Sequence, residues 1–425
     1  MTNRSQQPTI QDFKPLEIKL PTVKTLENGI TIYGFEAGMQ PITRIELIFD
    51  TGARYHRNPL VPMLTNRLLQ EGTHTENAAE IAETFDFCGA YLQNSQALDF
   101  STICLNTLSK HLNDLLPTFF DLLSTPTFPE TELKTILKNN LQDLETNKAK
   151  VSFLARRKFN SFLFGAENPY GRFPDVADYE AVKRDDLVHF FEKNYHNKNL
   201  TVMVAGKNTA ETIEKLIPYL EKIKEKTIEN EPFEFEINTA ETKKNFVAKK
   251  DAVQNALMIG KLCIAKIHPD YIGLKIANTV LGGYFGSRLM SNIREDKGYT
   301  YGIGSGMASY KNASFFSIFT EVGSNVSALA LTEIYKEIDL LCQKEIDLDE
   351  LSTVKSYLKG VMLSNFNGAF ATADRFKDVH LFGLDMNYYH NFGSELETIT
   401  PARIQKLMQT YLSPDSFLEV VVGNN

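Results

Sequence analysis

The chain has 425 residues, of which 43% are hydrophobic, and its formal net charge is -8. This length exceeds one ordinary core and indicates several structural units, and the composition is not that of a disordered or low-complexity protein. The acidic balance argues against a general nucleic-acid-binding surface, although a local basic groove stays compatible with it.

The N-terminal stretch "MTNRSQQPTIQDFKPLEIKLP" is polar and has no apolar region of the kind that signal peptides need. No stretch elsewhere reaches the roughly 18 apolar residues that span a bilayer. We therefore expect no export signal, no association with a membrane and a cytoplasmic location, or a periplasmic location if an upstream signal was removed.

The first half predicts strands and helices in a clear order. Two apolar runs flank Asn28-Gly29, a sequence typical of a β-hairpin turn. The alternating strand "RIELIFDTG" follows, and then a helix, a second helix in "NAAEIAETFDFC" and two strands within "AYLQNSQALDFSTICLN". We expect helices at residues 59–71, 108–124 and 129–147.

The helix in "PLVPMLTNRLLQEGT" has recognisable ends. Asn58 is a plausible N-cap, Pro59 stands at the first helical position, and Gly72 predicts a left-handed cap at the end. Met63 and Arg67 are four residues apart, so they share one face.

The second half repeats the plan of the first. It offers a strand in "NALMIGKLCIA", a helix in "YIGLKIANTVLG", two strands in "YTYGIGSGMASYKNASFFSIFTEV", and long helices at about 326–343 and 348–366. "LVHFFEKNYHNKNLTVMVAGK" and the C-terminal "IQKLMQTYLSPDSFLEVVVGN" both read as a helix, a tyrosine, a polar turn and a strand that ends in glycine. "FLFG" at 162–165 matches "HLFG" at 380–383 at nearly the same offset.

Two echoes in register predict duplicated domains. Each domain has an α+β pattern, with an antiparallel sheet and helices packed on one face. The charged segment 221–245, which contains Pro232, is typical of a linker. We therefore expect domains at 1–230 and 231–425.

The cysteines and histidines give no metal motif. Cys88, Cys104, Cys263 and Cys342 are scattered among apolar residues and form no C-x-x-C pair, so we expect buried reduced thiols. No H-x-x-H or H-x-x-E-H pattern occurs, and the histidines do not cluster with cysteines or carboxylates at ligand spacing. The sequence therefore predicts no zinc site built from this chain alone.

Other motifs leave one pair of interest. "GGYFGS" and "GIGSG" lack the features of a phosphate loop, and no G-x-S-x-G elbow supports a serine hydrolase. "SNIREDKGYTYGIGS" places Arg294 near the end of a helical stretch and Tyr301 seven residues later, in the next strand. Both side chains can donate hydrogen bonds to one carbonyl or carboxylate, as in an oxyanion hole. The alternative is an ordinary solvated arginine beside a packed tyrosine.

With these features, from about residue 20 to residue 423, the chain resembles the pitrilysin, insulin-degrading and mitochondrial-processing peptidases, the inverzincin zinc peptidases. Their first helix carries G-x-x-H-x-x-E-H-x-x-x-x-G-T, which aligns without a gap on Gly72-Thr73. In this register the two ligand histidines become Met63 and Arg67, and the catalytic glutamate becomes Asn66.

The third ligand of that family should fall near Gln142-Asp143. A methionine is too soft a ligand for zinc and an arginine repels it, so the resemblance implies a degenerate H-x-x-E-H motif and no bound catalytic zinc.

The second half keeps the family's pattern. "GGYFGSRLMSNIREDKGYTY" at 282–301 is similar to the family's G-G-x-x-S-R-L-x-x-x-I-R-E-x-x-G-x-x-Y. The resemblance implies that Arg294 and Tyr301 contact the substrate and the tetrahedral intermediate opposite the zinc. In two-chain members one subunit carries the zinc motif and the other carries this pair, and this chain resembles the subunit without zinc.

The resemblance therefore implies a heterodimer with a zinc-binding sibling that has an intact H-x-x-E-H motif. The partner holds the zinc, and the pair degrades short unfolded peptides bound as an added β-strand. Two alternatives stay open. One is an inactive homologue that acts as a scaffold or peptide-binding protein, and the other is a homodimer with a different activity at Met63, Asn66 and Arg67.

Overall fold

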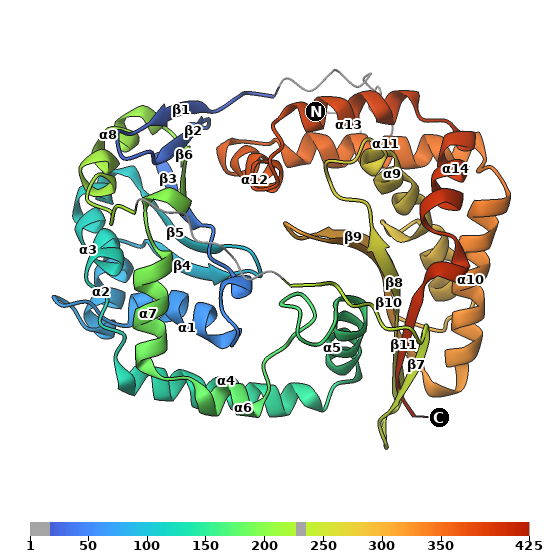
Figure 1. Cartoon of the computed structure of the whole chain (residues 1–425). Helices are drawn as coiled ribbons and strands as arrows, with labels where there is room; N and C mark the ends of the chain where they lie inside the picture. The colour runs from blue at the N-terminus through green and yellow to red at the C-terminus, as the bar shows by residue number, and fades with distance from the viewer. Residues whose placement is uncertain (1–17, 227–234, 425) are drawn as a thin grey trace, which may run out of the picture.

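The computed structural model of this chain describes residues 18–226 and 235–424. Each of the two segments builds one β-sheet with several helices packed against it (Figure 1). The predicted domain boundary at 230/231 and most of the polar N-terminal stretch lie outside the described residues.

The first half contains six strands and eight α-helices within residues 18–226. They are β1 (Thr22–Thr25), β2 (Thr31–Glu36), β3 (Ile42–Phe49), α1 (Leu60–Leu68), α2 (Ala78–Phe87), β4 (Tyr91–Gln96), β5 (Ser101–Leu108), α3 (Leu112–Ser124), α4 (Glu130–Lys148), α5 (Val151–Phe164), α6 (Val176–Ala181), α7 (Arg184–Asn194), β6 (Leu200–Gly206) and α8 (Thr209–Leu220).

The second half contains five strands, six α-helices and one π-helical segment within residues 235–424. They are β7 (Lys244–Ala248), β8 (Gln254–Cys263), α9 (Tyr271–Gly282), the π-helix η5 (Met290–Asp296), β9 (Ile303–Ser309), β10 (Ser314–Gly323), α10 (Ser327–Gln343), α11 (Leu348–Asn365), α12 (Ala369–His380), α13 (Asn387–Thr398), α14 (Pro401–Tyr411) and β11 (Leu418–Gly423).

The two sheets have the same topology. The first runs β1-β2-β6-β3-β5-β4, and the second runs β7-β11-β8-β10-β9. The second order matches the first from β2 onward, without a counterpart of β1. Strands β2 and β6 pair in parallel, as do β7 and β11, and the other neighbouring strands in both sheets pair antiparallel. The duplicated α+β fold predicted from the sequence is confirmed, with one parallel pair added in each sheet.

Each half also lends a helix to the other half's sheet. Helix α5 packs on β8 and β11 of the second sheet, where the fully buried Phe159 ring lies against Gly260. Helix α12 packs on β2 and β6 of the first sheet, where the Phe376 ring lies 4.8 Å from that of Tyr33 and 5.2 Å from that of Phe35. Both sheets are therefore covered on two faces, one by their own helices and one by an exchanged helix (Figure 1).

The echo between "FLFG" and "HLFG" marks the ends of these exchanged helices. Helix α5 ends at Phe164 and α12 ends at His380, and the motif glycine follows each helix. Gly165 has φ of +97° and Gly383 has φ of +75°, a backbone region that glycine adopts without strain. The repeat in the sequence thus lies at the ends of both exchanged helices, with Gly165 directly after α5 and Gly383 three residues after α12.

Polar contacts join the two halves beside the exchanged helices. Lys377 on α12 forms an ion pair with the buried Glu46 on β3 at 3.0 Å, and Asp374 binds Arg44 at 2.9 Å. At the β9–β10 turn, the backbone N–H of Lys311 donates to the Asp99 carboxylate at 3.0 Å. The halves are therefore held together by specific pairs as well as by apolar packing.

All four cysteines are free, and Cys88, Cys104 and Cys342 are buried while Cys263 is half-buried. Within residues 18–226 and 235–424, no helix has both the length and the apolarity needed to cross a membrane.

Candidate functional site

Helix α1 carries Met63, Asn66 and Arg67, the residues that the sequence resemblance sets at the positions of a zinc motif. The Asn58 Oδ1 accepts a hydrogen bond from the Leu60 backbone N–H at 3.0 Å, as expected of a helix cap, and Pro59 already has helical backbone angles. The predicted left-handed cap at Gly72 is wrong, because its φ of 162° is extended. A Cβ atom at Gly72 would meet Thr127 Oγ1 at 2.8 Å, so this position needs glycine because the neighbouring chain packs closely against it.

Met63, Asn66 and Arg67 line one pocket, and the face predicted to be shared by Met63 and Arg67 is turned toward it. The pocket has a volume of about 320 Å³ and is bounded by α1, β4 and α4. Its lining residues are Met63, Leu64, Asn66, Arg67, Asn94, Gln96, Ile136, Asn139 and Asn140. The register of α4 differs from expectation, because Gln142 and Asp143 are exposed and do not line the pocket.

The three positions are held in different ways. Asn66 is 1% exposed, and its Nδ2 donates to the Tyr195 hydroxyl at 3.3 Å. The Asn94 Nδ2 donates to the Asn66 carbonyl at 2.7 Å, which ties β4 to α1. Arg67 points toward solvent and lies 3.6 Å from Glu71, whose pKa is raised by burial.

These side chains do not fit a catalytic zinc ion. Zinc in peptidases is held by imidazole, thiolate or carboxylate groups, and the pocket lining offers amides, a thioether and a guanidinium. Asn66, which the resemblance sets at the position of the general base, has a neutral amide that cannot accept a proton at ordinary pH. The pocket can form hydrogen bonds with a polar ligand, but its groups do not activate water through a metal.

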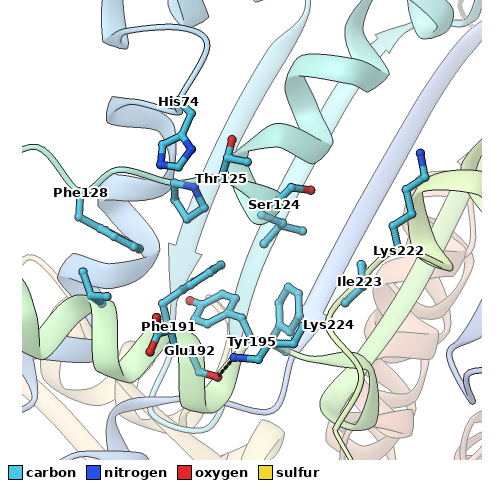
Figure 2. A pocket seen from close by; sticks show the side chains of 14 residues that line it. His74, Ser124, Thr125, Phe128, Phe191, Glu192, Tyr195, Lys222, Ile223 and Lys224 are labelled. Carbon is cyan, nitrogen blue, oxygen red and sulfur yellow. Dashed lines mark hydrogen bonds between the residues drawn. The ribbon is translucent and has the colours of Figure 1, made fainter.

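A second pocket is lined by Tyr195, the residue whose hydroxyl accepts the hydrogen bond from Asn66 of α1. In Figure 2, His74 and Phe128 lie at the left, Phe191, Glu192 and Tyr195 lie below Ser124 and Thr125, and Lys222 and Ile223 lie at the right. Its volume is about 380 Å³. The Lys224 Nζ donates to the Glu192 carbonyl at 3.0 Å, and burial raises the pKa of Tyr195 to about 12. None of the residues predicted as functional lines this pocket.

Arg294 and Tyr301 come together in the second half. Arg294 lies on the π-helix η5, where the Lys297 N–H donates to the Asn292 carbonyl five residues back. The Arg294 guanidinium lies 4.6 Å from the centre of the Phe285 ring, and its Nη1 is 3.7 Å from Glu295. Short π-helical turns often occur at functional sites, because they redirect a side chain without ending the helix.

The Tyr301 side chain projects into solvent beside this arginine. It is 96% exposed, and Arg294 Nε donates to its backbone carbonyl at 3.1 Å. Tyr301 lies two residues before β9 and not within the strand, which corrects the sequence prediction. Both residues line an open pocket of about 600 Å³, together with Gln254, Glu295, Gly298, Tyr299, Thr300 and Gly323.

The two predicted residue sets occupy separate pockets with no lining residue in common. The first pocket belongs to α1, α4 and β4, and the second to η5 and the segment before β9. Chemically, the second pocket offers a fixed guanidinium and a free phenol, two hydrogen-bond donors suited to a carbonyl oxygen or carboxylate.

Comparison with protein families finds a match to the peptidase M16 inactive domain over residues 181–358. An uncharacterized zinc protease YmxG of Bacillus subtilis is 23% identical over 408 residues, covering 93% of this chain and 97% of the relative. A non-peptidase homolog YmxG of Helicobacter pylori is 22% identical, with 92% and 90% covered. The mitochondrial-processing peptidase subunit beta of Bos taurus is 21% identical, with 83% and 74% covered.

The fold is also found among solved structures. A peptidase M16 inactive domain from Pseudomonas fluorescens matches with a TM-score of 0.85 and 24% identity, covering 95% of this chain and 98% of that chain. The likeness in fold therefore extends over both halves of this chain.

Proposed function

Because the chain is a homologue of the M16 peptidases and matches their inactive domain, we propose that it is the zinc-free subunit of a heterodimeric zinc metallopeptidase that degrades short peptides. One observation carries this proposal. The motif pocket around Met63, Asn66 and Arg67 lacks the donor set for zinc, while Arg294 and Tyr301 stand together beside an open pocket. Such a chain has half of the groups that peptide hydrolysis needs.

The missing half would come from a sibling with an intact H-x-x-E-H motif. Zinc bound in that sibling would supply an activated water for attack on the peptide carbonyl. In this chain, the guanidinium of Arg294 and the phenol of Tyr301 would donate hydrogen bonds to the carbonyl oxygen as negative charge develops on it. They would also fix the peptide backbone in the orientation that attack requires.

The sheets offer places for a peptide in extended form. Strand β9 is an edge strand of the second sheet and begins two residues after Tyr301. Strand β4 is an edge strand of the first sheet, and its Asn94 and Gln96 line the motif pocket. A peptide added to an outermost strand gains backbone hydrogen bonds that are independent of its sequence, which suits a broad range of short peptides.

A quenched fluorescent peptide assay tests the proposal. The chain is assayed alone, and then mixed with an H-x-x-E-H-bearing relative encoded in the same genome. We expect cleavage only in the mixture, with loss of cleavage when the relative's motif glutamate is replaced. Cleavage by this chain alone would contradict the reading of Met63, Asn66 and Arg67.

A second candidate function is that of an inactive scaffold or peptide-binding protein. The name of the Helicobacter pylori relative, a non-peptidase homolog, favours it. The two functions differ in the mixture, because a scaffold would bind the peptide or the sibling without being needed for cleavage. A cytoplasmic location, with periplasmic as the alternative, belongs to the same proposal.

A further inference from the structure

We propose that Cys88, His111 and Asp114 form a zinc site that clamps helix α2 to helix α3. Their ligand atoms, a thiol sulfur, an imidazole nitrogen and a carboxylate oxygen, all lie within 4.8 Å of one another. The site lies outside the motif pocket and outside the Arg294 pocket. It does not depend on the function proposed above.

The backbone fixes each ligand at the end of a helix. Cys88 follows the last residue of α2, and the turn closes at Gly89, whose φ is +60° and whose N–H donates to the Asp86 carbonyl. His111 immediately precedes α3, and Asp114 is three residues later on the first turn. Residues three apart on a helix share a face, so the imidazole and the carboxylate point the same way.

The three side chains are not committed to other partners. Among the residues that the structure describes, none of them donates or accepts a hydrogen bond, and His111 Nδ1 lies 3.7 Å from the Asp114 carboxylate. Cys88 is buried, His111 is half-buried and Asp114 is exposed, so the cluster runs from the core to the surface. A metal ion can therefore enter from solvent and reach the thiol.

The donor set favours zinc among common metals. Sulfur, nitrogen and oxygen donors at about 2.0–2.3 Å are typical of Zn²⁺, whereas Mg²⁺ and Ca²⁺ prefer sites made of oxygen atoms alone. Three protein ligands leave a fourth tetrahedral position for water. Because the present spacing of the ligand atoms is already short, side-chain rotation suffices to bring them into range.

Half of this signal is visible in the sequence. "HLND" at 111–114 places a histidine and an aspartate three apart at a helix start, but Cys88 lies 23 residues earlier, at the end of another helix. The expectation that histidines do not cluster with cysteines or carboxylates is wrong for this group, because the packing of α2 on α3 brings them together. With this proposal, the expectation that the chain binds no metal is kept only for the motif pocket.

The experiment counts zinc on the full chain after removal of metal with a chelator and dialysis against micromolar Zn²⁺. We expect about one zinc per chain, lost in Cys88→Ser and lost or strongly weakened in His111→Asn and Asp114→Asn. Cys263→Ser and His390→Asn, which change a cysteine and a histidine outside the cluster, should keep the zinc. Zinc that stayed bound in both Cys88→Ser and His111→Asn would contradict this site. If that zinc were held in the motif pocket, it would also contradict the proposed function.

Two further readouts separate a built site from adventitious binding. Co²⁺ in place of zinc should give a sulfur-to-cobalt charge-transfer band that is absent in Cys88→Ser. Zinc should raise the midpoint of thermal unfolding in the unmodified chain but not in His111→Asn, whose side chain is accessible enough to be changed without loss of the fold. Equal zinc binding by all variants, or none by the unmodified chain, would overturn the proposal.

Discussion

Arg294 holds the main chain of Tyr301, with its Nε donating to the Tyr301 carbonyl oxygen at 3.1 Å, while the Tyr301 phenol is 96% exposed. The arginine therefore has two tasks, since it can face a ligand and also fixes the position from which the tyrosine projects. The tyrosine hydroxyl is free to take a ligand as its partner. This difference makes the two residues separable by substitution.

We expect Tyr301→Phe to lower kcat/KM of the reconstituted heterodimer by about tenfold, the loss of one hydrogen bond to a charged group. Arg294→Ala should lower it by about 10²-fold, because the guanidinium and the fixed position of Tyr301 are both lost. The measurement is steady-state cleavage of a quenched peptide by the mixture of the two chains.

Lys297→Ala serves as the matched control, because it removes an exposed cation three residues from Arg294. It should leave kcat/KM within about twofold, as expected when a charge is screened by solvent. If Arg294→Ala and Lys297→Ala behaved alike, the arginine would have no special part in catalysis.

The motif pocket predicts how zinc binding can be restored. In a Cys88→Ser background, the triple change Met63→His, Asn66→Glu and Arg67→His supplies two imidazoles and a base but lacks the third ligand on α4. Asn140, which lines the pocket from α4, is the position at which Asn140→Glu would complete the set.

Zinc counted after dialysis should be low in the triple variant and near one per chain once Asn140→Glu is added. Gln142 and Asp143, which the sequence register favoured, are exposed and outside the pocket, so Gln142→Glu as the fourth change is the control. Equal binding with either fourth change would show that the register of α4 on α1 is not as described.

Much of the fold follows from the sequence, because the repeat, the hairpin turn at Asn28-Gly29 and the alternating strands each have a local signal. The exchange of α5 and α12 has no such signal. An apolar helix face predicts that the face will be buried, but it does not predict which sheet will cover it. "FLFG" and "HLFG" were visible as an echo, yet their shared place at the ends of the two exchanged helices is seen only in the structure.

The candidate site, like the fold, could be predicted from the sequence only in part. The positions Met63, Asn66 and Arg67 came from the family resemblance, and the structure brings all three to one pocket. The third ligand was expected near Gln142-Asp143, but these residues are exposed, and α4 faces the pocket with Ile136, Asn139 and Asn140. The support of Asn66 by Tyr195 joins residues 129 apart, a contact that no local pattern predicts.

The exchanged helix α5 predicts a large loss of stability from one substitution. Phe159 is fully buried between the two halves, with its ring against Gly260 and 6.3 Å from the Phe315 ring. We expect Phe159→Ala to lower the free energy of unfolding by about 3–5 kcal/mol, the usual cost of emptying an aromatic site in a core.

Urea unfolding followed by circular dichroism measures this loss. Phe87→Ala is the matched control, because the Phe87 side chain is 90% exposed and its removal creates no cavity. A loss for Phe159→Ala as small as that for Phe87→Ala would mean that α5 does not pack on the second sheet in solution.

The buried His196 makes the stability of the first half depend on pH. Its Nδ1 accepts the Lys198 N–H at 3.2 Å, and its Nε2 is buried without a hydrogen-bond partner in the described part of the chain. Burial, with Lys226 and Lys224 nearby, lowers its pKa from 6.5 to about 4. The folded state therefore keeps this imidazole neutral at pH values where the unfolded chain binds a proton.

The sign of the effect follows from that difference. Above pH 6.5 neither state is protonated and the stabilisation is complete, whereas between pH 6.5 and 4 the unfolded state gains a proton and is favoured. The loss from this one group reaches about 3 kcal/mol near pH 4, since one pKa unit corresponds to about 1.4 kcal/mol. Carboxylates elsewhere also titrate in this range, so the comparison must be made against a variant.

His196→Asn removes the titrating group and keeps an oxygen that can accept the Lys198 N–H. We expect its free energy of unfolding, measured in urea from pH 7 to pH 4, to fall by about 2–3 kcal/mol less than that of the unmodified chain. His390→Asn, at an exposed histidine, should follow the unmodified chain throughout. Parallel curves for His196→Asn and the unmodified chain would show that the imidazole is protonated in the folded state, and hence that its surroundings admit water.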